Sequence, residues 1–228
     1  MSLFKAMTTL VLCVLAFLVG MVVSQMQIQP FNLVVDIERR VLGYDLTPNL
    51  NRDTLKKIYA SRALSPIVFI GDSHIQFGDW PALLNRTDIS SLGIAGENSR
   101  ELLARIKLRQ PEGAKVFIST GTNDVWNLAP EETVANLREI VSRLDVDNEV
   151  YLLAPPMTSL PKRNSFIKDI ITAENEICTK ARCKVVDANS IIAPSDIRSS
   201  DTTVDGVHLT DKGYRALAAI IAPFLAHG

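Results

Sequence analysis

Four short segments of the chain combine glycine with polar or titratable side chains. They are Gly71-Asp72-Ser73-His74, Gly93-Ile94-Ala95-Gly96-Glu97-Asn98, Gly121-Thr122-Asn123-Asp124 and Asp205-Gly206-Val207-His208. A serine hydroxyl becomes a nucleophile when an imidazole removes its proton and a third group orients that imidazole. The four segments contain each of these side-chain types, so they indicate nucleophilic chemistry at a serine.

The chain has three histidines, and one of them suits the role of base. His74 directly follows Ser73, and neighbouring side chains on a turn usually diverge. His227 is the penultimate residue. His208 remains, and Asp205 lies three residues before it, close enough for its carboxylate to accept the Nδ1–H and fix the tautomer. The predicted catalytic residues are therefore Ser73, Asp205 and His208.

Acyl transfer also needs fixed donors for the negative charge that develops on the carbonyl oxygen. Gly96 offers a backbone N–H that no side chain obstructs, Ser73 offers its own N–H, and Asn123 offers a side-chain amide. Loss of one such donor typically costs about 3–4 kcal/mol of transition-state stabilisation. The predicted oxyanion hole is therefore formed by Ser73, Gly96 and Asn123.

The elements that must position these residues follow from the periodicity after Ser65. Short, nearly continuous apolar runs alternate with segments of helical period. The predicted strands are 67–70, 89–92, 116–119, 150–154 and 184–187, and the predicted helices are about 97–109, 131–144, 163–180 and 211–225. This order favours an α/β fold with a five-stranded parallel sheet covered on both faces. Ligands bind such sheets beyond the carboxyl ends of the strands, where the four segments lie.

The four segments, in this order, resemble the four conserved blocks of the SGNH (GDSL-type) hydrolase family. The resemblance covers about residues 65–225. It implies a flavodoxin-like three-layer α/β/α sandwich, no metal, no cofactor, and ester hydrolysis through an acyl-enzyme. By position, Ser73 is the nucleophile, His208 the base and Asp205 its partner, while Gly96 and Asn123 complete the oxyanion hole.

The segment around Ser73, with Gly78-Asp79-Trp80 and residues 92–98, most resembles the small O-acetyl or short-acyl esterase branch. The expected substrates are acetyl or other short-chain esters, with acylated glycans or lipids as candidate alcohol components. Ser91 stands where the family often has asparagine, and Thr122 where glycine is frequent. An acyltransferase using the same residues, a lysophospholipase or thioesterase, and a non-catalytic envelope glycan-binding module remain alternatives.

Several other side chains have a predicted role. Trp126 either lines an acyl or sugar pocket or packs under the 131–144 helix, and Trp80 is predicted to pack. Asp72 is predicted to bind backbone N–H groups, and Asp124 is predicted to hold its own loop. Apolar residues occupy the opposite face of the 97–109 helix, so its basic residues are predicted to form a solvated surface. These are Arg100, Arg105, Lys107 and Arg109.

The N-terminal part predicts export. Residues 7–23 carry no charge and Lys5 precedes them, which is typical of a signal peptide or an uncleaved signal anchor. The predicted division is 1–24 signal or anchor (a transmembrane helix at about 7–23), 25–64 juxtamembrane stalk and 65–228 hydrolase domain. The catalytic domain would then lie outside the cytoplasm, membrane-anchored, or secreted if cleavage follows Ser24.

Two composition features bear on partners and compartment. The formal net charge of -1 offers no basic field for a phosphate backbone, so a nucleic-acid partner is not expected. Cys178 and Cys183 are the two cysteines outside the apolar run. In an exported domain they form either a disulfide or two separate buried thiols.

Overall fold

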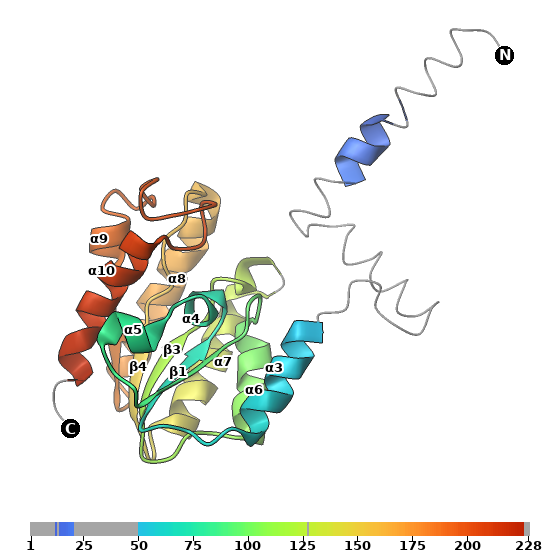
Figure 1. Cartoon of the computed structure of the whole chain (residues 1–228). Coiled ribbons are helices and arrows are strands. Elements are labelled where there is room, and N and C mark those ends of the chain that lie inside the picture. Colours follow the sequence, from blue (N-terminus) through green and yellow to red (C-terminus); the bar gives the residue numbers. More distant parts are fainter. Residues whose placement is uncertain (1–11, 13, 21–49, 127, 226–228) are drawn as a thin grey trace, which may run out of the picture. The chain divides into compact units, whose positions relative to one another are not determined.

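The computed structural model describes residues 12, 14–20, 50–126 and 128–225 (Figure 1). The chain divides into two compact units, Met1–Asn51 and Arg52–Gly228. In the first unit, residues 12 and 14–20 are helical. Within the described residues, no helix is both long enough and apolar enough to cross a membrane. Most of the predicted 7–23 segment and residues 25–49 of the predicted stalk lie outside the described residues.

The second unit is built on a five-stranded parallel sheet, as predicted. Its strand order is β2-β1-β3-β4-β5. The strands are β1 (Ile67–Gly71), β2 (Ile89–Gly93), β3 (Lys115–Ser119), β4 (Glu149–Leu153) and β5 (Cys183–Val186). Gly71 pairs with Gly93 on one side and with Ser119 on the other. The three strands that precede the first three polar segments therefore end level, at one edge of the sheet.

Helices cover both faces of the sheet, which gives the predicted three layers (Figure 1). The strand residues Val68 and Val116 pack against α6 and α7, whereas Phe69 and Phe117 face α5, α9 and α10. The main helices are α5 (Trp80–Leu84), α6 (Ser99–Leu108), α7 (Pro130–Leu144), α8 (Pro161–Cys178), α9 (Asn189–Ile192) and α10 (Asp211–Ile221). The α10 helix is shorter than predicted because residues 222–225 form a 3-10 turn.

Trp80 is fully buried and stacks on Phe69, with ring centroids 4.5 Å apart. Phe69 stacks in turn on Phe117 at 4.8 Å. Large aromatic side chains contribute strongly to a core when their polar atoms are satisfied, and the Trp80 indole N–H donates to the Ile75 carbonyl at 2.9 Å. The prediction that Trp80 packs in the core is thus confirmed.

Cys178 and Cys183 form a disulfide, with their Cα atoms 4.9 Å apart. The bond joins the last residue of α8 to the first residue of β5. Of the two alternatives left open by the sequence, the structure therefore has the disulfide.

The helix α3 (Leu50–Ser61) precedes the sheet, and its residues from Arg52 onward belong to the second unit. It contacts α6 and the end of β2: the Arg52 guanidinium lies 2.6 Å from the Glu101 carboxylate, and the Tyr59 hydroxyl donates to the Gly93 carbonyl at 3.2 Å. Residues 52–64 of the predicted stalk thus belong to the same compact unit as the sheet.

Candidate active site

The Ser73 turn is set by close backbone packing between β1, β3 and the short helix α4 (Ser73–Gln76). A Cβ on Gly71 would lie 1.9 Å from the Ser119 carbonyl oxygen, and one on Gly93 would lie 2.1 Å from the Gln76 backbone nitrogen. Only glycine fits such approaches. Asp72 caps α4, because its Oδ1 accepts the His74 N–H at 2.9 Å. Asp72 thus binds a backbone N–H group, as predicted.

The three predicted catalytic side chains form a continuous chain of contacts. The Ser73 hydroxyl oxygen lies 3.1 Å from His208 Nε2, and His208 Nδ1 lies 2.6 Å from Asp205 Oδ2. The other oxygen of Asp205 accepts the backbone N–H of Val207 at 2.9 Å and of His208 at 2.7 Å. Asp205 therefore fixes both the loop and the ring, and leaves Nε2 directed at the serine.

The Asp205 carboxyl has a low pKa, about 2 instead of its ordinary 3.8. Partial burial works in the opposite direction, but hydrogen bonds from the His208 backbone, the His208 ring and the Val207 backbone outweigh it. Hydrogen bonds to the ionised form lower a carboxyl pKa. Asp205 is thus an anion at neutral pH, and it can stabilise a positive charge on the His208 ring.

His74 and Arg198 hold the loop that carries His208, a role that the sequence did not reveal. Both side chains are buried. His74 Nε2 lies 3.1 Å from the Val207 carbonyl oxygen, and Arg198 Nη1 donates to the same oxygen. His74 Nδ1 lies 3.3 Å from Asp72 Oδ1. His74 therefore connects the Ser73 turn to the loop that carries His208.

The second segment is tied to the Ser73 turn at several points. The Ile94 N–H donates to the Gly71 carbonyl at 2.8 Å, and the Ala95 N–H donates to Gln76 Oε1 at 2.6 Å. Gly96 adopts φ +76, a backbone region that favours glycine, and a Cβ built there would meet open space. In the described part of the chain, neither the Gly96 N–H nor the Ser73 N–H has an acceptor. Two backbone donors are therefore available at this edge of the sheet.

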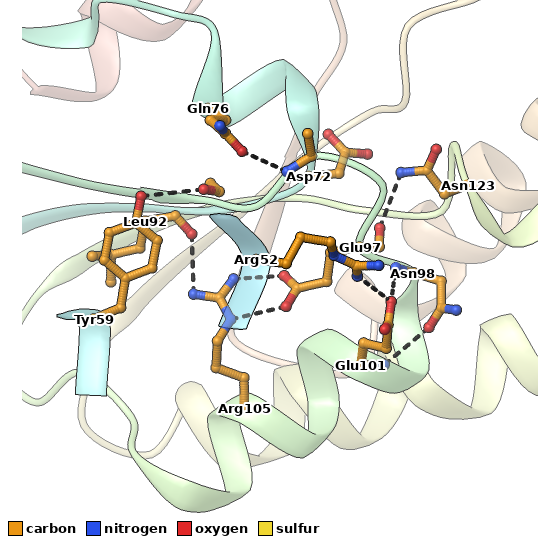
Figure 2. A network of polar contacts seen from close by, with 12 residues as sticks. Arg52, Tyr59, Asp72, Gln76, Leu92, Glu97, Asn98, Glu101, Arg105 and Asn123 are labelled. Atoms are coloured by element: carbon orange, nitrogen blue, oxygen red, sulfur yellow. Dashed lines mark hydrogen bonds and ion pairs between the residues drawn. The ribbon is translucent and has the colours of Figure 1, made fainter. Parts of the chain in front are cut away.

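Asn123, the third predicted donor, is held by the second segment. One hydrogen of its amide Nδ2 donates to the Glu97 carbonyl at 3.1 Å (Figure 2). An amide nitrogen carries two hydrogens, so one remains for a ligand. The structure thus joins Asn123 to the loop that contains Gly96.

The sequence profile of the GDSL-like Lipase/Acylhydrolase family matches residues 69–216, which include every one of these site residues. The chain belongs to this family. Family membership supports an ester-hydrolysing enzyme.

Solved structures agree with this fold. This acylhydrolase is similar to a Streptococcus pneumoniae protein described as a platelet activating factor, with TM-score 0.70, 22% identity, and coverage of 85% of this chain and 98% of the other. It is also similar to a variant of an acetyl-xylooligosaccharide esterase from Geobacillus, with TM-score 0.59, 19% identity, and coverage of 72% and 95%.

One curated relative is an N-acylneuraminate cytidylyltransferase from Escherichia coli, 28% identical over 207 residues. The match covers 84% of this chain and 48% of the relative. The chain therefore spans about half the length of that relative.

The third segment of this GDSL-like acylhydrolase is anchored by Asp124, which is fully buried. Its carboxylate accepts the Ser99 backbone N–H at 2.9 Å, the Ser99 hydroxyl, and the Thr133 hydroxyl at 2.8 Å. Burial raises its carboxyl pKa although these hydrogen bonds oppose the shift. Asp124 holds its own loop, as predicted, and it also joins that loop to the start of α6 and to α7.

Replacing Asp124 with alanine is expected to lower the free energy of unfolding by about 2–4 kcal/mol, because it leaves buried donors on Ser99 and Thr133 without this acceptor. Urea denaturation followed by circular dichroism measures the change. Asp53→Ala removes an exposed carboxylate of α3 and serves as control, with an expected change below about 0.5 kcal/mol. Equal stability of the two variants would contradict this role.

Trp126 is 53% exposed, so it does not pack under α7. The Arg163 guanidinium lies 5.2 Å from the centre of its ring, and Arg163 Nη2 donates to the Thr122 carbonyl at 2.5 Å. An exposed indole thus lies beside the third segment. Its predicted role in substrate binding stays a prediction.

The prediction of a uniformly solvated basic face on α6 is wrong at Arg105. Its side chain is 12% exposed and contacts Glu97, which is 1% exposed, at 2.6 Å. Arg100 does lie on the surface, where it pairs with Glu132 at 2.6 Å. The difference arises because α3 and the loop after β2 cover Arg105, and helical periodicity alone cannot show this.

No group of three or more His, Cys, Asp or Glu side chains within the described ranges is arranged to hold a metal ion.

Proposed function

We propose that this GDSL-like acylhydrolase is a serine esterase that cleaves carboxylic esters of acetyl or other short acyl groups through an acyl-enzyme on Ser73. The observation that carries the proposal is the continuous chain of contacts from the Ser73 hydroxyl through His208 to Asp205, at 3.1 and 2.6 Å. A hydroxyl within hydrogen-bond reach of an oriented imidazole is the arrangement that nucleophilic acyl transfer requires.

In the first half-reaction, the Ser73 oxygen attacks the carbonyl carbon while its proton passes to His208 Nε2. The Asp205 carboxylate stabilises the imidazolium that forms. The N–H groups of Ser73 and Gly96 and the free hydrogen of the Asn123 amide stabilise the oxyanion. The ester C–O bond then breaks, and His208 returns its proton to the leaving alcohol.

In the second half-reaction, water replaces the alcohol. His208 Nε2 takes a proton from this water, and the hydroxide oxygen attacks the acyl carbon. The bond to the Ser73 oxygen breaks, the serine recovers its proton from His208, and the free acid leaves. An acyltransferase would use the same residues with an acceptor hydroxyl in place of water.

Three observations support a carbohydrate as the alcohol component. One structural neighbour is described as an acetyl-xylooligosaccharide esterase, and the curated relative is named for an N-acylneuraminate, a sugar whose named acyl group is on nitrogen. The exposed indole of Trp126 also offers a flat apolar face beside the third segment. We propose acetylated sugars as the first substrates to assay.

We also propose that the catalytic unit works outside the cytoplasm, anchored or released through the N-terminal segment. The Cys178–Cys183 disulfide supports this location, because disulfides persist in oxidising compartments. The uncharged segment 7–23 after Lys5 supports it independently.

A fluorophosphonate probe tests the proposed nucleophile. We expect covalent labelling of the full chain at Ser73, located by peptide mass spectrometry, and loss of esterase activity in step with labelling. The serine oxygen attacks the phosphorus of the probe and fluoride leaves, which forms a phosphonate ester only when a base activates that serine. An unlabelled protein, or labelling at another residue, would favour a non-catalytic binding module instead.

Kinetic assays on the unlabelled protein determine which acyl chain length it prefers. We expect kcat/KM for p-nitrophenyl acetate to exceed that for the palmitate ester by about tenfold or more. A reversed preference would favour a lysophospholipase or thioesterase. Acetate release from acetylated sugars, measured with and without a glycan acceptor, separates hydrolysis from acyl transfer.

A further inference from the structure

An ion pair between Glu97 and Arg105, whose side chains are 1% and 12% exposed, contacts the loop that holds Asn123. The Glu97 carboxylate accepts two hydrogen bonds from Arg105, from Nε at 3.0 Å and from Nη2 at 2.6 Å (Figure 2). A guanidinium that binds both carboxylate oxygens restricts their orientation more than a single contact does. The backbone carbonyl of the same Glu97 accepts the Asn123 amide at 3.1 Å. The ion pair therefore acts on the residue that orients this amide.

Two further contacts hold the start of the loop. Arg105 Nη1 donates to the Leu92 carbonyl at 3.0 Å, so one guanidinium contacts both the end of β2 and Glu97. The Tyr59 hydroxyl donates to the Gly93 carbonyl at 3.2 Å, and the Arg105 guanidinium lies 5.9 Å from the centre of the Tyr59 ring. Residues 94–96, which include Gly96, thus lie between two points fixed by Arg105.

Helix α3 supplies part of this support. Besides Tyr59, its Arg52 donates to the Glu101 carboxylate at 2.6 Å, and Glu101 accepts the Asn98 backbone N–H at 3.2 Å (Figure 2). A mostly apolar cavity of about 260 Å³, lined by residues of α3 and α6, lies between these helices. The contacts of Arg52 and Tyr59 join α3 to α6 and to the end of β2 beside this cavity. This helix lies outside the residues 69–216 that match the family.

The ion pair is poorly explained as a stabilising contact. Burial raises the pKa of the Glu97 carboxyl, and the Arg105 charge opposes that shift. Desolvation of a buried pair often cancels its attraction, and apolar residues of similar volume are frequently as stabilising. The geometry that the pair imposes is the property that apolar residues could not reproduce.

From these contacts we infer that Glu97 and Arg105, braced by Tyr59 and Arg52 of α3, are positioning residues for the oxyanion hole. They act through the Glu97 carbonyl on the Asn123 amide. This inference rests on the proposed function, since it assigns support to the donors of the same site.

A double-mutant cycle on the full chain tests the inference. Arg105→Lys keeps the charge but cannot bind both Glu97 oxygens and the Leu92 carbonyl as the guanidinium does. We expect it to lower kcat for p-nitrophenyl acetate about tenfold with KM changed less than about twofold, the pattern of a lost transition-state interaction. In an Asn123→Ala background the further loss is expected to stay below about threefold, because residues that act through one another are not additive.

Arg100→Met is the matched control on the same helix, since Arg100 pairs with Glu132 at the surface. It is expected to leave kcat within about twofold of the starting protein. Glu97→Gln removes the charge that pairs with Arg105 but keeps the backbone carbonyl that accepts the Asn123 amide, and it is the second test if Arg105→Lys does not fold. We expect it to lower kcat about threefold in the original background and less than about twofold in the Asn123→Ala background.

An equal loss of kcat in both backgrounds, or no loss in the original background, would overturn the inference. Thermal unfolding of each folded variant separates lost stability from lost positioning. Ser73→Ala distinguishes this failure from a failure of the proposed function. If that variant loses activity while the cycle is additive, only the positioning role is wrong; if it stays active, the esterase mechanism itself is wrong.

Discussion

Replacing Ser73 with alanine is expected to lower kcat for p-nitrophenyl acetate by about 10⁴-fold or more, the scale seen when the nucleophile of a serine hydrolase is removed. Alanine leaves no oxygen in the position 3.1 Å from His208 Nε2, so no acyl-enzyme can form. The oxyanion donors would remain in place, and any residual rate would come from water attacking a bound ester.

The fold should survive this change. The Ser73 side-chain hydroxyl makes its hydrogen bond to a partly exposed ring, and its loss is expected to change the free energy of unfolding by about 1 kcal/mol or less. Initial rates and urea denaturation on the same preparations measure both quantities. Ser142→Ala removes an exposed hydroxyl of α7 and serves as control, with activity retained. Activity of Ser73→Ala close to that of the control would rule out the proposed mechanism.

Asp205→Asn is expected to lower kcat at pH 7 by about 10⁴-fold, the loss known for an amide in place of the triad carboxylate on an unrelated fold. The amide cannot stabilise the imidazolium, and its NH₂ group can oppose the tautomer that carries the proton on Nδ1. The effect should appear in kcat more than in KM, because the carboxylate contacts the base and not the ester.

The pH dependence follows from the low pKa of Asp205. Its pKa is about 2, below the ordinary value, so its hydrogen bonds stabilise the folded loop at neutral pH. That contribution to stability is lost as the pH falls below the ordinary carboxyl pKa of 3.8 and then through the folded-state pKa of about 2. Loss of activity between pH 7 and pH 4 must therefore come from a group other than Asp205.

Kinetics at pH 7 on Asp205→Asn and on a matched variant measure the effect. Asp201→Asn alters an exposed aspartate in the same loop, which pairs with Lys212, and it is expected to keep kcat within about twofold. A loss of less than tenfold in Asp205→Asn would show that this carboxylate does not orient the base.

Much of the fold could be predicted because its determinants are local. The strand-length apolar runs and helical periods located all five strands and the four longest helices after the sheet begins, within a few residues. The largest error in an element end was at α10, where Pro223 falls in a turn that the apolar pattern continues through. Hydrophobic periodicity indicates which face of a helix is buried, but it locates the end of the helix poorly.

The place where the candidate site residues meet could also be predicted, for a related reason. Parallel strands bring their carboxyl ends to one edge, so segments after β1, β2 and β3 had to meet. The three-residue spacing of Asp205 and His208 allowed their contact at 2.6 Å without any tertiary information. His208 and Ser73 are 135 positions apart in the sequence. Their contact was expected from the order of the four segments, but it forms only when the chain folds.

The contacts that support the site were not predictable. His74 reaches the Val207 carbonyl and Arg198 reaches the same oxygen, although neither belongs to a pattern of its own. Arg105 follows the same helical period as the surface Arg100, yet it is covered by α3 and pairs with Glu97. Whether a polar residue at the margin of an amphipathic helix is buried depends on which element packs beside it.

The sequence by itself therefore determined the alternation of strands and helices, the edge of the sheet at which a ligand could bind, and the side chains proposed to act there. Tertiary structure alone decided which buried polar groups hold those side chains, and it placed α3 against the loop after β2. The reason is physical: propensity and periodicity act over a few residues, whereas burial and hydrogen-bond partners arise between segments that are distant along the chain.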